Sequence, residues 1–510
     1  MGEAAAASGP DLSQGVSASD VPLGGTLPGR VGDQPVLLSN VDGELFAVGG
    51  TCTHYGAALA DGITDGTGVR CPLHHACFDL RTGVALRAPG LDPLDRWLVE
   101  VEGQRVFVRR KLAADPTVSA LSNGIERIVI VGGGAAGLAC AHELRRLGFG
   151  GELIMLSADK DPPCDRPNLS KDYLAGSAPE EWLWLRSDDW YSDNRIDLRL
   201  STQVTRIDPA ARTVGCGSGE EIAFDRLLIA TGAEPNGLRV PGFNRPNVYT
   251  LRTVADARNL ARQARAGARA VIIGASFIAL EAAAALRQRG VAVDIVSVEE
   301  VPLERVFGTE VGEQIQALHE RNGVRFRLGS VVAEFDGAAV TLAGGESLAA
   351  DFVLVGIGVR PRTELAASAG AAVENGVLVD SFLETSLPGI FAAGDIAGYP
   401  DRASGERVRI EHWAVAERQG QVAAANMLGG HRQFESPPFF WTEQYGIALR
   451  YVGRAGGWDA VTVEGEVETG SLLARYFTDG THCATATIGR DRDNLEDELE
   501  LERRAVISLS

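Results

Sequence analysis

The sequence predicts a multidomain protein with a small all-β domain, two α/β domains and a C-terminal α+β domain. Three observations support this prediction. The chain has 510 residues, which is long enough for several domains. Two cysteine–histidine pairs lie among short alternating strands in its first quarter. Two glycine-rich turns, each between an apolar strand and a helix, begin near residues 132 and 274.

The two cysteine–histidine pairs predict a metal centre. Cys52 and His54 form C-x-H, and Cys71 and His74 form C-x2-H after a gap of sixteen residues. Two thiolates on one iron and two neutral imidazoles on the other are the ligands of a Rieske [2Fe-2S] cluster. A structural zinc site is the alternative, but zinc fingers place both cysteines together before two histidines on a helix. The spacing selects His74 and leaves His75 as a loop residue or a support for a ligand.

The segments around these pairs predict β-hairpins. Residues 36–48 contain a D-G turn and residues 96–110 an E-G turn. This part of the chain, about 12–110, resembles the Rieske ferredoxin family. High-potential members of that family carry an extra cysteine in each loop, where this chain has Ala57 and Leu73. The resemblance therefore implies a low-potential cluster without a disulfide, and Cys77 is interpreted as a packed thiol.

Composition excludes several classes of function. The net charge of −20 argues against nucleic-acid binding and against an anionic membrane surface. Seven cysteines without framework spacing favour a reducing, cytoplasmic location. No segment reads as a membrane span. Residues 1–12 lack the features of a signal peptide and are predicted to be a disordered leader.

The first glycine-rich turn predicts a nucleotide site. It follows an apolar strand at 128–131 and opens an alanine-rich helix. Its glycines permit a tight turn, close approach of a pyrophosphate and packing of the helix on the strand. An aspartate follows the second strand, where an adenosine ribose is expected. The predicted contacts are Gly132, Gly134, Ala136, Gly137 and Asp159.

The second turn repeats this pattern with two departures. Ser276 and Ala279 stand where the second and third glycines would be. Ser297 occupies the position of the carboxylate that reads an NAD ribose, so NADH and NADPH both stay open. Glu299, two residues further on, would favour NAD. The predicted nucleotide contacts here are Gly274, Ser276, Phe277, Ile278 and Ser297.

Three further motifs are more specific than either turn. They are LLIATGAEPN (227–236), VGIGVRP (355–361) and GIFAAGDIA (389–397). Together they resemble the flavoprotein family with two dinucleotide-binding domains. The resemblance implies Rossmann-like domains, with FAD on the first turn and at the final Gly-Asp, and NAD(P)H in the middle domain. The implied contacts are Ala230, Thr231, Gly232, Gly358, Gly394 and Asp395.

Three further segments indicate which branch of this flavoprotein family the chain resembles. Residues 164–171, 409–429 and 437–446 resemble the ferredoxin reductases of bacterial oxygenase systems and the apoptosis-inducing-factor relatives, a branch of which carries a Rieske domain in front. The resemblance places Lys171 and Glu281 as a pair at the catalytic site, with a purely structural pair as the alternative. Cys164 departs from the usual tyrosine. The other implied flavin contacts are Arg166, Glu411, His412, Trp413 and Trp441.

These matches divide the chain into segments. After the leader come a Rieske domain (13–110), a linker (111–124), the FAD domain in two parts (125–240 and 363–433), an inserted NAD(P)H domain (241–362) and a C-terminal domain of reductase dimerisation type (434–510). The acidic stretch 491–504 is interpreted as a solvated helix face, with partner docking as the alternative. A homodimer is possible.

Electron counting leads to the predicted function. No C-x2-C or C-x4-C pair is present for disulfide-reductase chemistry. The sequence therefore predicts an NAD(P)H oxidoreductase in which hydride passes to FAD and single electrons pass through the [2Fe-2S] cluster to an external acceptor, such as an oxygenase or a cytochrome P450. The alternative is a nucleotide-responsive redox sensor of apoptosis-inducing-factor type with slow turnover.

Overall fold

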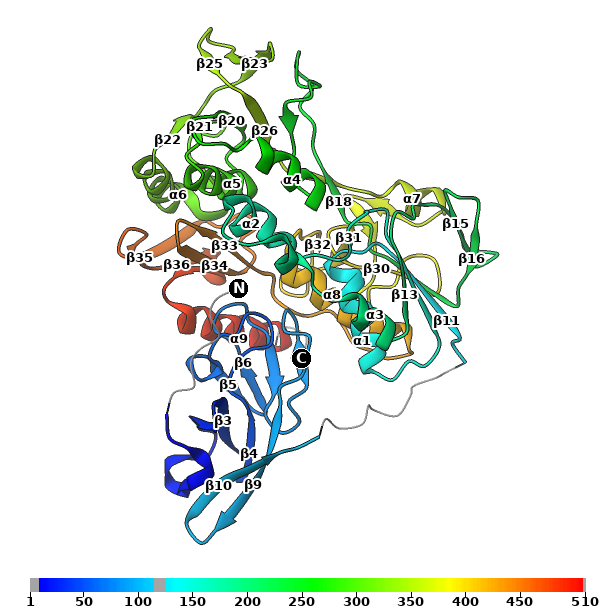
Figure 1. Cartoon of the computed structure of the whole chain (residues 1–510), viewed down its shortest axis with the longest axis vertical. Helices are drawn as coiled ribbons and strands as arrows, with labels where there is room; N and C mark the ends of the chain where they lie inside the picture. The colour runs from blue at the N-terminus through cyan, green and yellow to red at the C-terminus, as the bar shows by residue number, and fades with distance from the viewer. Residues whose placement is uncertain (1–8, 114–123, 508–510) are drawn as a thin grey trace.

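The computed structural model describes residues 9–113 and 124–507, which form four parts (Figure 1). An N-terminal β domain (blue) lies at one end of the molecule. The first α/β domain (cyan and yellow) and the second (green) lie side by side at the other end. A C-terminal sheet (orange) and helix (red) stand between the second α/β domain and the N-terminal domain. Within the described ranges, no helix is both long and apolar enough to cross a membrane.

The N-terminal β domain contains two antiparallel sheets, of order β1-β10-β9-β4-β3-β2 and β5-β6-β7-β8. Asp42 and Gly43, with φ of 54° and 92°, form the tight turn that the D-G pair predicts between β3 and β4. Its strands are β1 Val16–Ser17, β2 Thr26–Val31, β3 Gln34–Val41, β4 Glu44–Gly49, β5 Ile63–Asp65, β6 Gly68–Arg70, β7 Cys77–Asp79, β8 Ala85–Arg87, β9 Arg96–Glu102 and β10 Arg105–Lys111.

The ends of this domain differ from the predicted leader and linker. Leu12, assigned to a disordered leader, is fully buried in the short helix η1 (Leu12–Gln14), because it fills the core between the first strands. Lys111, assigned to the linker, is the last residue of β10. The rest of these two segments lies largely outside the described residues, at 1–8 and 114–123.

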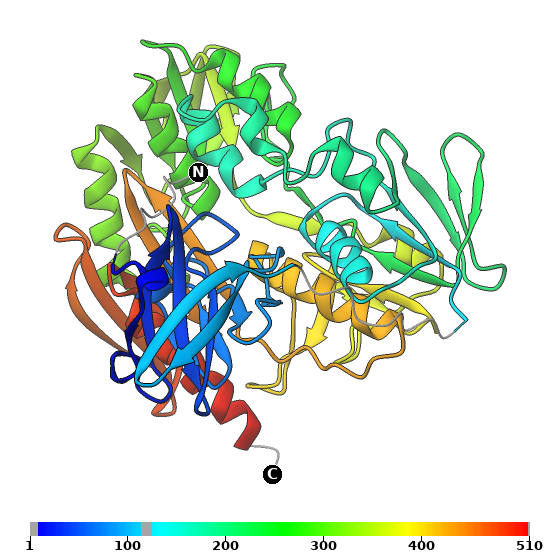
Figure 2. The same cartoon turned by 60° about the horizontal axis from the view of Figure 1, so that its bottom comes forward.

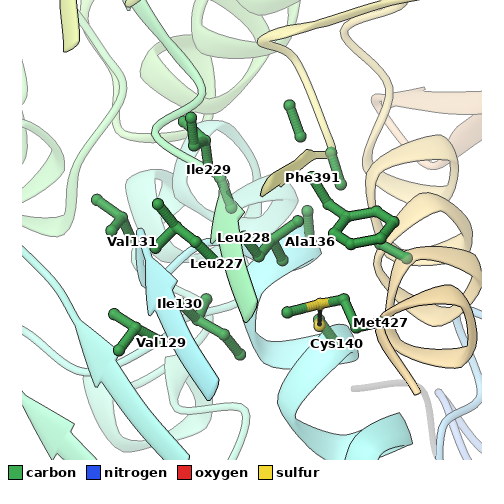
Figure 3. Close-up of a cluster of buried hydrophobic side chains, with 14 of the residues drawn as sticks. Val129, Ile130, Val131, Ala136, Cys140, Leu227, Leu228, Ile229, Phe391 and Met427 are labelled. Carbon is green, nitrogen blue, oxygen red and sulfur yellow. Dashed lines mark hydrogen bonds between the residues drawn. The ribbon is translucent and has the colours of Figure 1, made fainter. Parts of the chain in front are cut away.

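The first α/β domain is a parallel sheet of order β13-β12-β11-β17-β30. Except for the edge strand β13, its strands are short apolar runs, which is typical of strands buried on both faces. Figure 3 shows this core between the sheet and two helices, where the Cys140 thiol donates to the sulfur of Met427 at 3.9 Å. The main elements are β11 Arg127–Val131, α1 Ala135–Arg146, β12 Glu152–Leu156, β13 Ile196–Arg199, β17 Arg226–Ile229, β30 Ile390–Ala392 and α8 Trp413–Met427.

Smaller elements decorate this domain. A three-stranded sheet of β14 to β16 and a four-stranded sheet of β28, β29, β31 and β32 flank the parallel sheet. These elements are η4 Arg166–Ser170, α2 Asp172–Ala175, η5 Glu180–Leu183, α3 Asp188–Asp193, β14 Val204–Asp208, β15 Thr213–Cys216, β16 Glu221–Ala223, α7 Glu364–Ser368, β28 Val373–Glu374, β29 Gly376–Leu378, β31 Ala397–Pro400 and β32 Arg407–Val408.

The second α/β domain repeats the architecture, with a parallel sheet of order β19-β26-β20-β21-β22. The antiparallel pair of β18 (Ala233–Pro235) and β27 (Val359–Pro361) carries the chain into it and back. Its elements are β19 Val248–Tyr249, α4 Val254–Gln263, β20 Arg269–Ile273, α5 Phe277–Gln288, β21 Ala292–Val296, α6 Glu304–Arg321, β22 Val324–Arg327, β23 Val332–Phe335, β24 Ala339–Leu342, β25 Ser347–Ala349 and β26 Phe352–Val355.

The C-terminal domain is an antiparallel sheet of order β33-β34-β37-β36-β35 followed by helix α9. The sheet shares an apolar core with the second α/β domain. These elements are β33 Phe439–Gln444, β34 Ile447–Gly453, β35 Ala460–Glu466, β36 Ser471–Thr478, β37 Thr481–Ile488 and α9 Asp491–Ile507. The predicted fold class, all-β followed by α/β domains and an α+β domain, is confirmed.

Helix α9 corrects one interpretation. The stretch 491–504 was expected to be a solvated helix face, yet Asn494, Leu495 and Glu498 are fully buried. Both views show α9 against the N-terminal β domain (Figures 1 and 2). Leu495 and Leu499 pack there on Ile63. The acidic face therefore connects domains within the chain, because Arg70, Arg87 and Arg418, with which it pairs, come from other domains.

Candidate active site and metal centre

The two cysteine–histidine loops share one backbone pattern. The N–H of Cys52 donates to the carbonyl of Ala57, and that of Cys71 to Ala76, both at 2.8 Å. His75 takes a left-handed φ of 60° at the position where the first loop has a glycine. Each loop therefore folds back on its cysteine, and both cysteines are buried and unpaired by disulfides. The hydrogen bond from Cys52 is the main cause that lowers the pKa of Cys71.

The structure brings His54 and His74 together. Their Nδ1 atoms lie 3.1 Å apart, and their rings meet edge to face with centroids 4.9 Å apart. Burial lowers the pKa of His54 to about 3 and that of His74 well below its usual value. Both imidazoles are therefore neutral at physiological pH, the form that binds a metal. The two imidazoles thus lie together, as do the two thiols, which is the pairing that a cluster of two irons requires.

His75 points elsewhere. Its ring stacks on Phe439 with centroids 4.0 Å apart. Its Nδ1 lies 3.0 Å from the Glu498 carboxylate of α9, and both side chains are fully buried. The choice of His74 over His75 as a ligand is consistent with this geometry, since His75 is part of the joint with α9.

Aromatic side chains link this centre to the α/β domains. The ring of Trp441, on β33, lies 4.2 Å from His74 and 6.1 Å from His54, measured between centroids. Tyr55 stacks on His54 at 3.9 Å, and its hydroxyl donates to Asp165 in the first α/β domain. Both histidines therefore face the rest of the protein.

A cavity of about 1430 Å³ lies between the two α/β domains and reaches Trp441. All but three of the predicted nucleotide contacts line it. These lining residues are Gly132, Gly134, Ala136, Asp159, Arg166, Lys171, Ala230, Thr231, Gly232, Ser276, Phe277, Ile278, Glu281, Gly358, Gly394, Asp395, Glu411, His412, Trp413 and Trp441.

The remaining three predicted contacts lie outside the cavity. A side chain at Gly137 would meet the carbonyl of Gly132 at 2.1 Å, and one at Gly274 would meet the carbonyl of Gly356 at 2.4 Å. These two glycines serve close packing of the backbone. Ser297 is also buried, and its hydroxyl accepts the N–H of Glu299 at 3.2 Å. Ser297 does not line this cavity, and its contact with the nucleotide stays a prediction.

The two glycine-rich turns are built differently. The N-terminus of α1 at Gly134 has no side-chain cap, and a side chain there would enter open space. Its free N–H groups can face an anion. The hydroxyl of Ser276 instead caps α5, accepting the N–H of Ala279 at 3.4 Å while donating to Gly356 at 2.9 Å. The second turn thus uses its serine to hold the helix.

The segments after the second strand of each sheet are equivalent. Ser157 accepts the N–H of Asp159 at 3.2 Å, just as Ser297 accepts the N–H of Glu299. The carbonyl of Asp159 accepts the N–H of Ser201 at 2.8 Å. In the same way the carbonyl of Glu299 accepts the N–H of Gly329, which follows β22, at 3.0 Å. Glu299 is therefore the counterpart of Asp159, which lines the cavity.

A buried ion pair stands in the cavity wall. Lys171 Nζ lies 2.9 Å from the carboxylate of Glu281, which is 3% exposed. Ser170 donates to the same carboxylate, and Thr442 of β33 donates to its other oxygen at 2.7 Å. Both oxygens of the carboxylate accept donors from two other domains, so the charge of Lys171 is fixed in position.

The cavity's other charged groups come from distant segments. Asp395 pairs with Arg252 at 2.5 Å. Burial raises the pKa of Glu411 and lowers that of His412 to about 4. Gly394, in the left-handed region at φ 83°, donates its N–H to Gln419 at 2.8 Å.

Comparison with known proteins identifies this arrangement. A family model described as pyridine nucleotide-disulphide oxidoreductase matches residues 126–420, more than half of the chain. The chain belongs to that family. Models described as Rieske [2Fe-2S] domain and reductase C-terminal match residues 15–110 and 439–508.

Individual relatives agree with these models. Apoptosis-inducing factor 3 of Homo sapiens is 34% identical over 476 residues, which are 89% of this chain and 78% of that protein. Rhodocoxin reductase of Rhodococcus erythropolis is 36% identical, covering 72% of this chain and 87% of its own. The structure of a covalent putidaredoxin reductase–putidaredoxin complex matches with a TM-score of 0.72 at 34% identity, over 74% of this chain and 93% of that chain.

This member of the pyridine nucleotide-disulphide oxidoreductase family is an FAD-dependent NAD(P)H oxidoreductase with a Rieske [2Fe-2S] domain. The zinc alternative is thereby set aside. The cavity fits FAD, because the Nε of Arg166 and the Nδ1 of His412 are buried there without a hydrogen-bond partner, and the first turn presents free N–H groups. The paired thiols and paired imidazoles of the N-terminal domain fit the cluster.

Sequence reasoning missed several residues that join these sites. Asp165 lies within the segment 164–171, but no local sequence pattern indicates that its carboxylate accepts a hydrogen bond from Tyr55 of the Rieske domain. Arg418 and Arg450 likewise reach the cluster loops from more than three hundred residues away. Such contacts depend on how the domains dock, which no local pattern encodes.

Proposed function

We propose that this chain accepts hydride from NAD(P)H in its cavity and delivers single electrons through its own Rieske centre to an external oxygenase or cytochrome P450. When bound, FAD accepts the hydride and the [2Fe-2S] cluster carries one electron at a time. The residues of the chain bind and orient these groups and keep water away from them.

The position of Trp441 carries this proposal. It lines the cavity and also lies 4.2 Å from the ring of His74. The second contact, from Tyr55 to Asp165, joins the other histidine loop to the residue before Arg166, which lines the same cavity. The cavity and the cluster ligands are thus in contact through single side chains, and no separate ferredoxin is needed between them.

Within the cavity, we assign roles to the predicted residues. The first turn and Asp159 hold the FAD pyrophosphate and adenosine ribose, and Asp395 holds the ribityl chain that joins the pyrophosphate to the flavin ring. Lys171, fixed by Glu281, places a positive charge beside the flavin. No acid–base catalyst is required for hydride transfer. Outside the cavity lining, Glu299, the counterpart of Asp159, reads the adenosine ribose of the second nucleotide, which favours NADH.

The proposed acceptor follows from the relatives. Several are named as reductases of oxygenase systems, among them the anthranilate 1,2-dioxygenase system of Burkholderia cepacia, at 36% identity over 72% of this chain and 91% of that protein. In this chain the fused Rieske domain would take the place of a separate ferredoxin. A homodimer and a cytoplasmic location stay predictions.

Replacing a cluster ligand tests the proposal. In the cofactor-loaded protein, Cys71→Ser should abolish reduction of cytochrome c, a one-electron protein acceptor, by NADH. Bleaching of the flavin by NADH in the same sample is the internal reference, because the flavin is reduced before any electron reaches the cluster. Equal cytochrome reduction by both proteins would show that electrons leave from the flavin. Negligible turnover in the wild type, with NADH-dependent change in oligomeric state, would favour the redox sensor.

A further inference from the structure

Arg450 of the C-terminal domain reaches the cluster loop of the Rieske domain. Its Nε donates to the carbonyl of Leu73 at 2.8 Å, next to the ligand His74. Arg450 lies on β34 directly opposite Trp441 of β33, so the two side chains lie on one face of the sheet. The same face therefore presents an aromatic ring to His74 and a cation to the loop that carries it.

This cation is buried. Arg450 is only 6% exposed. Its Nη1 lies 2.7 Å from the carboxylate of Asp491, whose side chain is 29% exposed and thus partly hydrated. The counter-charge lies on the side of α9, and the Nε edge faces the cluster loop. Arg418 makes a similar bond to His75, but the fully buried Glu498 offsets its charge.

We propose that Arg450 tunes the reduction potential of the Rieske cluster from the neighbouring reductase domain. Reduction adds one electron and needs no proton or bond change, so the cluster becomes more negative by one charge. A fixed cation in a poorly solvated site stabilises that reduced state and raises the potential. The inference rests on the proposed function, in which this cluster takes electrons from the flavin. Arg450 makes the docked cluster a better acceptor.

A redox titration of the loaded full-length protein tests this inference. Mediators and dithionite set the potential, and electron paramagnetic resonance follows the reduced cluster, so the result does not depend on electron delivery by NADH. Arg450→Gln should lower the equilibrium constant for cluster reduction about tenfold, which is about 59 mV for one electron. Arg450→Lys, which keeps the charge, should restore most of the potential.

Asp491→Asn gives a prediction of the opposite sign. It removes the counter-charge and leaves the arginine, so the potential should rise. Arg475→Gln is the matched control, because Arg475 on β36 pairs with Asp497 of the same helix at 2.8 Å rather than with a cluster loop.

Wild-type potentials in both Arg450→Gln and Asp491→Asn would overturn the inference. If Arg450→Gln fails to assemble its cluster, Asp491→Asn decides: a raised potential supports the inference and an unchanged one overturns it. Failure of the proposed function is distinguishable, since the cluster would then titrate normally with dithionite but stay oxidised with NADH.

Discussion

Lys171 and Glu281 hold opposite charges in a part of the cavity wall where few waters reach. Removing one member of such a pair costs about 3–5 kcal/mol, because the other is left buried without compensation. Replacing both with apolar side chains costs far less. The pair therefore offers a way to separate a structural role from a role in the reaction.

A double-mutant cycle makes that separation. Glu281→Gln should lower the free energy of unfolding by about 3 kcal/mol, and Lys171→Met with Glu281→Leu should recover much of it. If Lys171 supports the reaction, the double variant will still bleach its flavin with NADH more slowly than the wild type, by stopped-flow absorbance. Full recovery of both stability and rate would leave the pair a purely structural one.

Glu299 is expected to determine nucleotide preference. A hydrogen bond to a charged group contributes about 1.5–3 kcal/mol, so Glu299→Ser should lower kcat/KM for NADH at least tenfold. The value for NADPH should change little or rise, because a negative charge that repels the 2′-phosphate is gone. Glu300→Ser, at the exposed neighbouring position, is the control. An unchanged NADH-to-NADPH ratio in Glu299→Ser would contradict the assignment.

The buried carboxyl group of Glu417 should make the stability of the protein depend on pH. Burial raises its pKa well above 4.5, and its Oε2 has no hydrogen-bond partner. The folded protein thus binds a proton that the unfolded chain releases near pH 4.5, so this group's contribution to stability falls as pH rises from there toward the folded pKa. Glu417→Gln should be more stable than the wild type at pH 8, with a smaller advantage at pH 5. Thermal unfolding at both values measures this, and equal Tm differences would contradict it.

At the scale of elements, helix α9 joins the Rieske domain to the reductase. Glu498 lies 3.0 Å from Arg70 and 3.3 Å from Arg418, which belong to those two parts of the chain. Glu502, one turn on, pairs with Arg70 at 2.7 Å and with Arg87 at 2.5 Å. This contact is mostly ionic, with a small apolar cluster of Ile63, Leu495 and Leu499. Polar joints of this kind are easier to open than hydrophobic ones.

Loss of Glu498 should open this joint. Glu498→Ala leaves its buried arginines with Glu502 and Asp65 as partners, and Arg418 without its carboxylate, so we expect a loss of about 3–5 kcal/mol and faster release of the Rieske domain by limited proteolysis. Glu496→Ala on the exposed face of the same helix, where Glu496 pairs with Arg492, should change stability by less than about 0.5 kcal/mol. Equal rates of proteolysis in the two variants would contradict the claim that Glu498 holds the Rieske domain to the reductase.

For the whole molecule, the sequence predicted what local patterns encode. The cysteine–histidine spacing and the two glycine turns predicted the order of domains, because each needs only a few adjacent residues. Burial of Glu498 could not be predicted, since its arginine partners lie up to 428 residues away. The contact of Trp441 with His74 depends in the same way on how two domains dock. The docked arrangement, rather than any one motif, places the cluster beside the cavity.

The central claim is that electrons pass from NADH to the Rieske cluster within one chain. The most direct measurement is an anaerobic titration of the purified protein with NADH, following flavin bleaching by absorbance and the cluster by electron paramagnetic resonance. We predict that the flavin bleaches and the signal of a reduced Rieske cluster grows in the same titration. A bleached flavin beside a cluster that stays silent with NADH, yet gives its signal with dithionite, would contradict the claim.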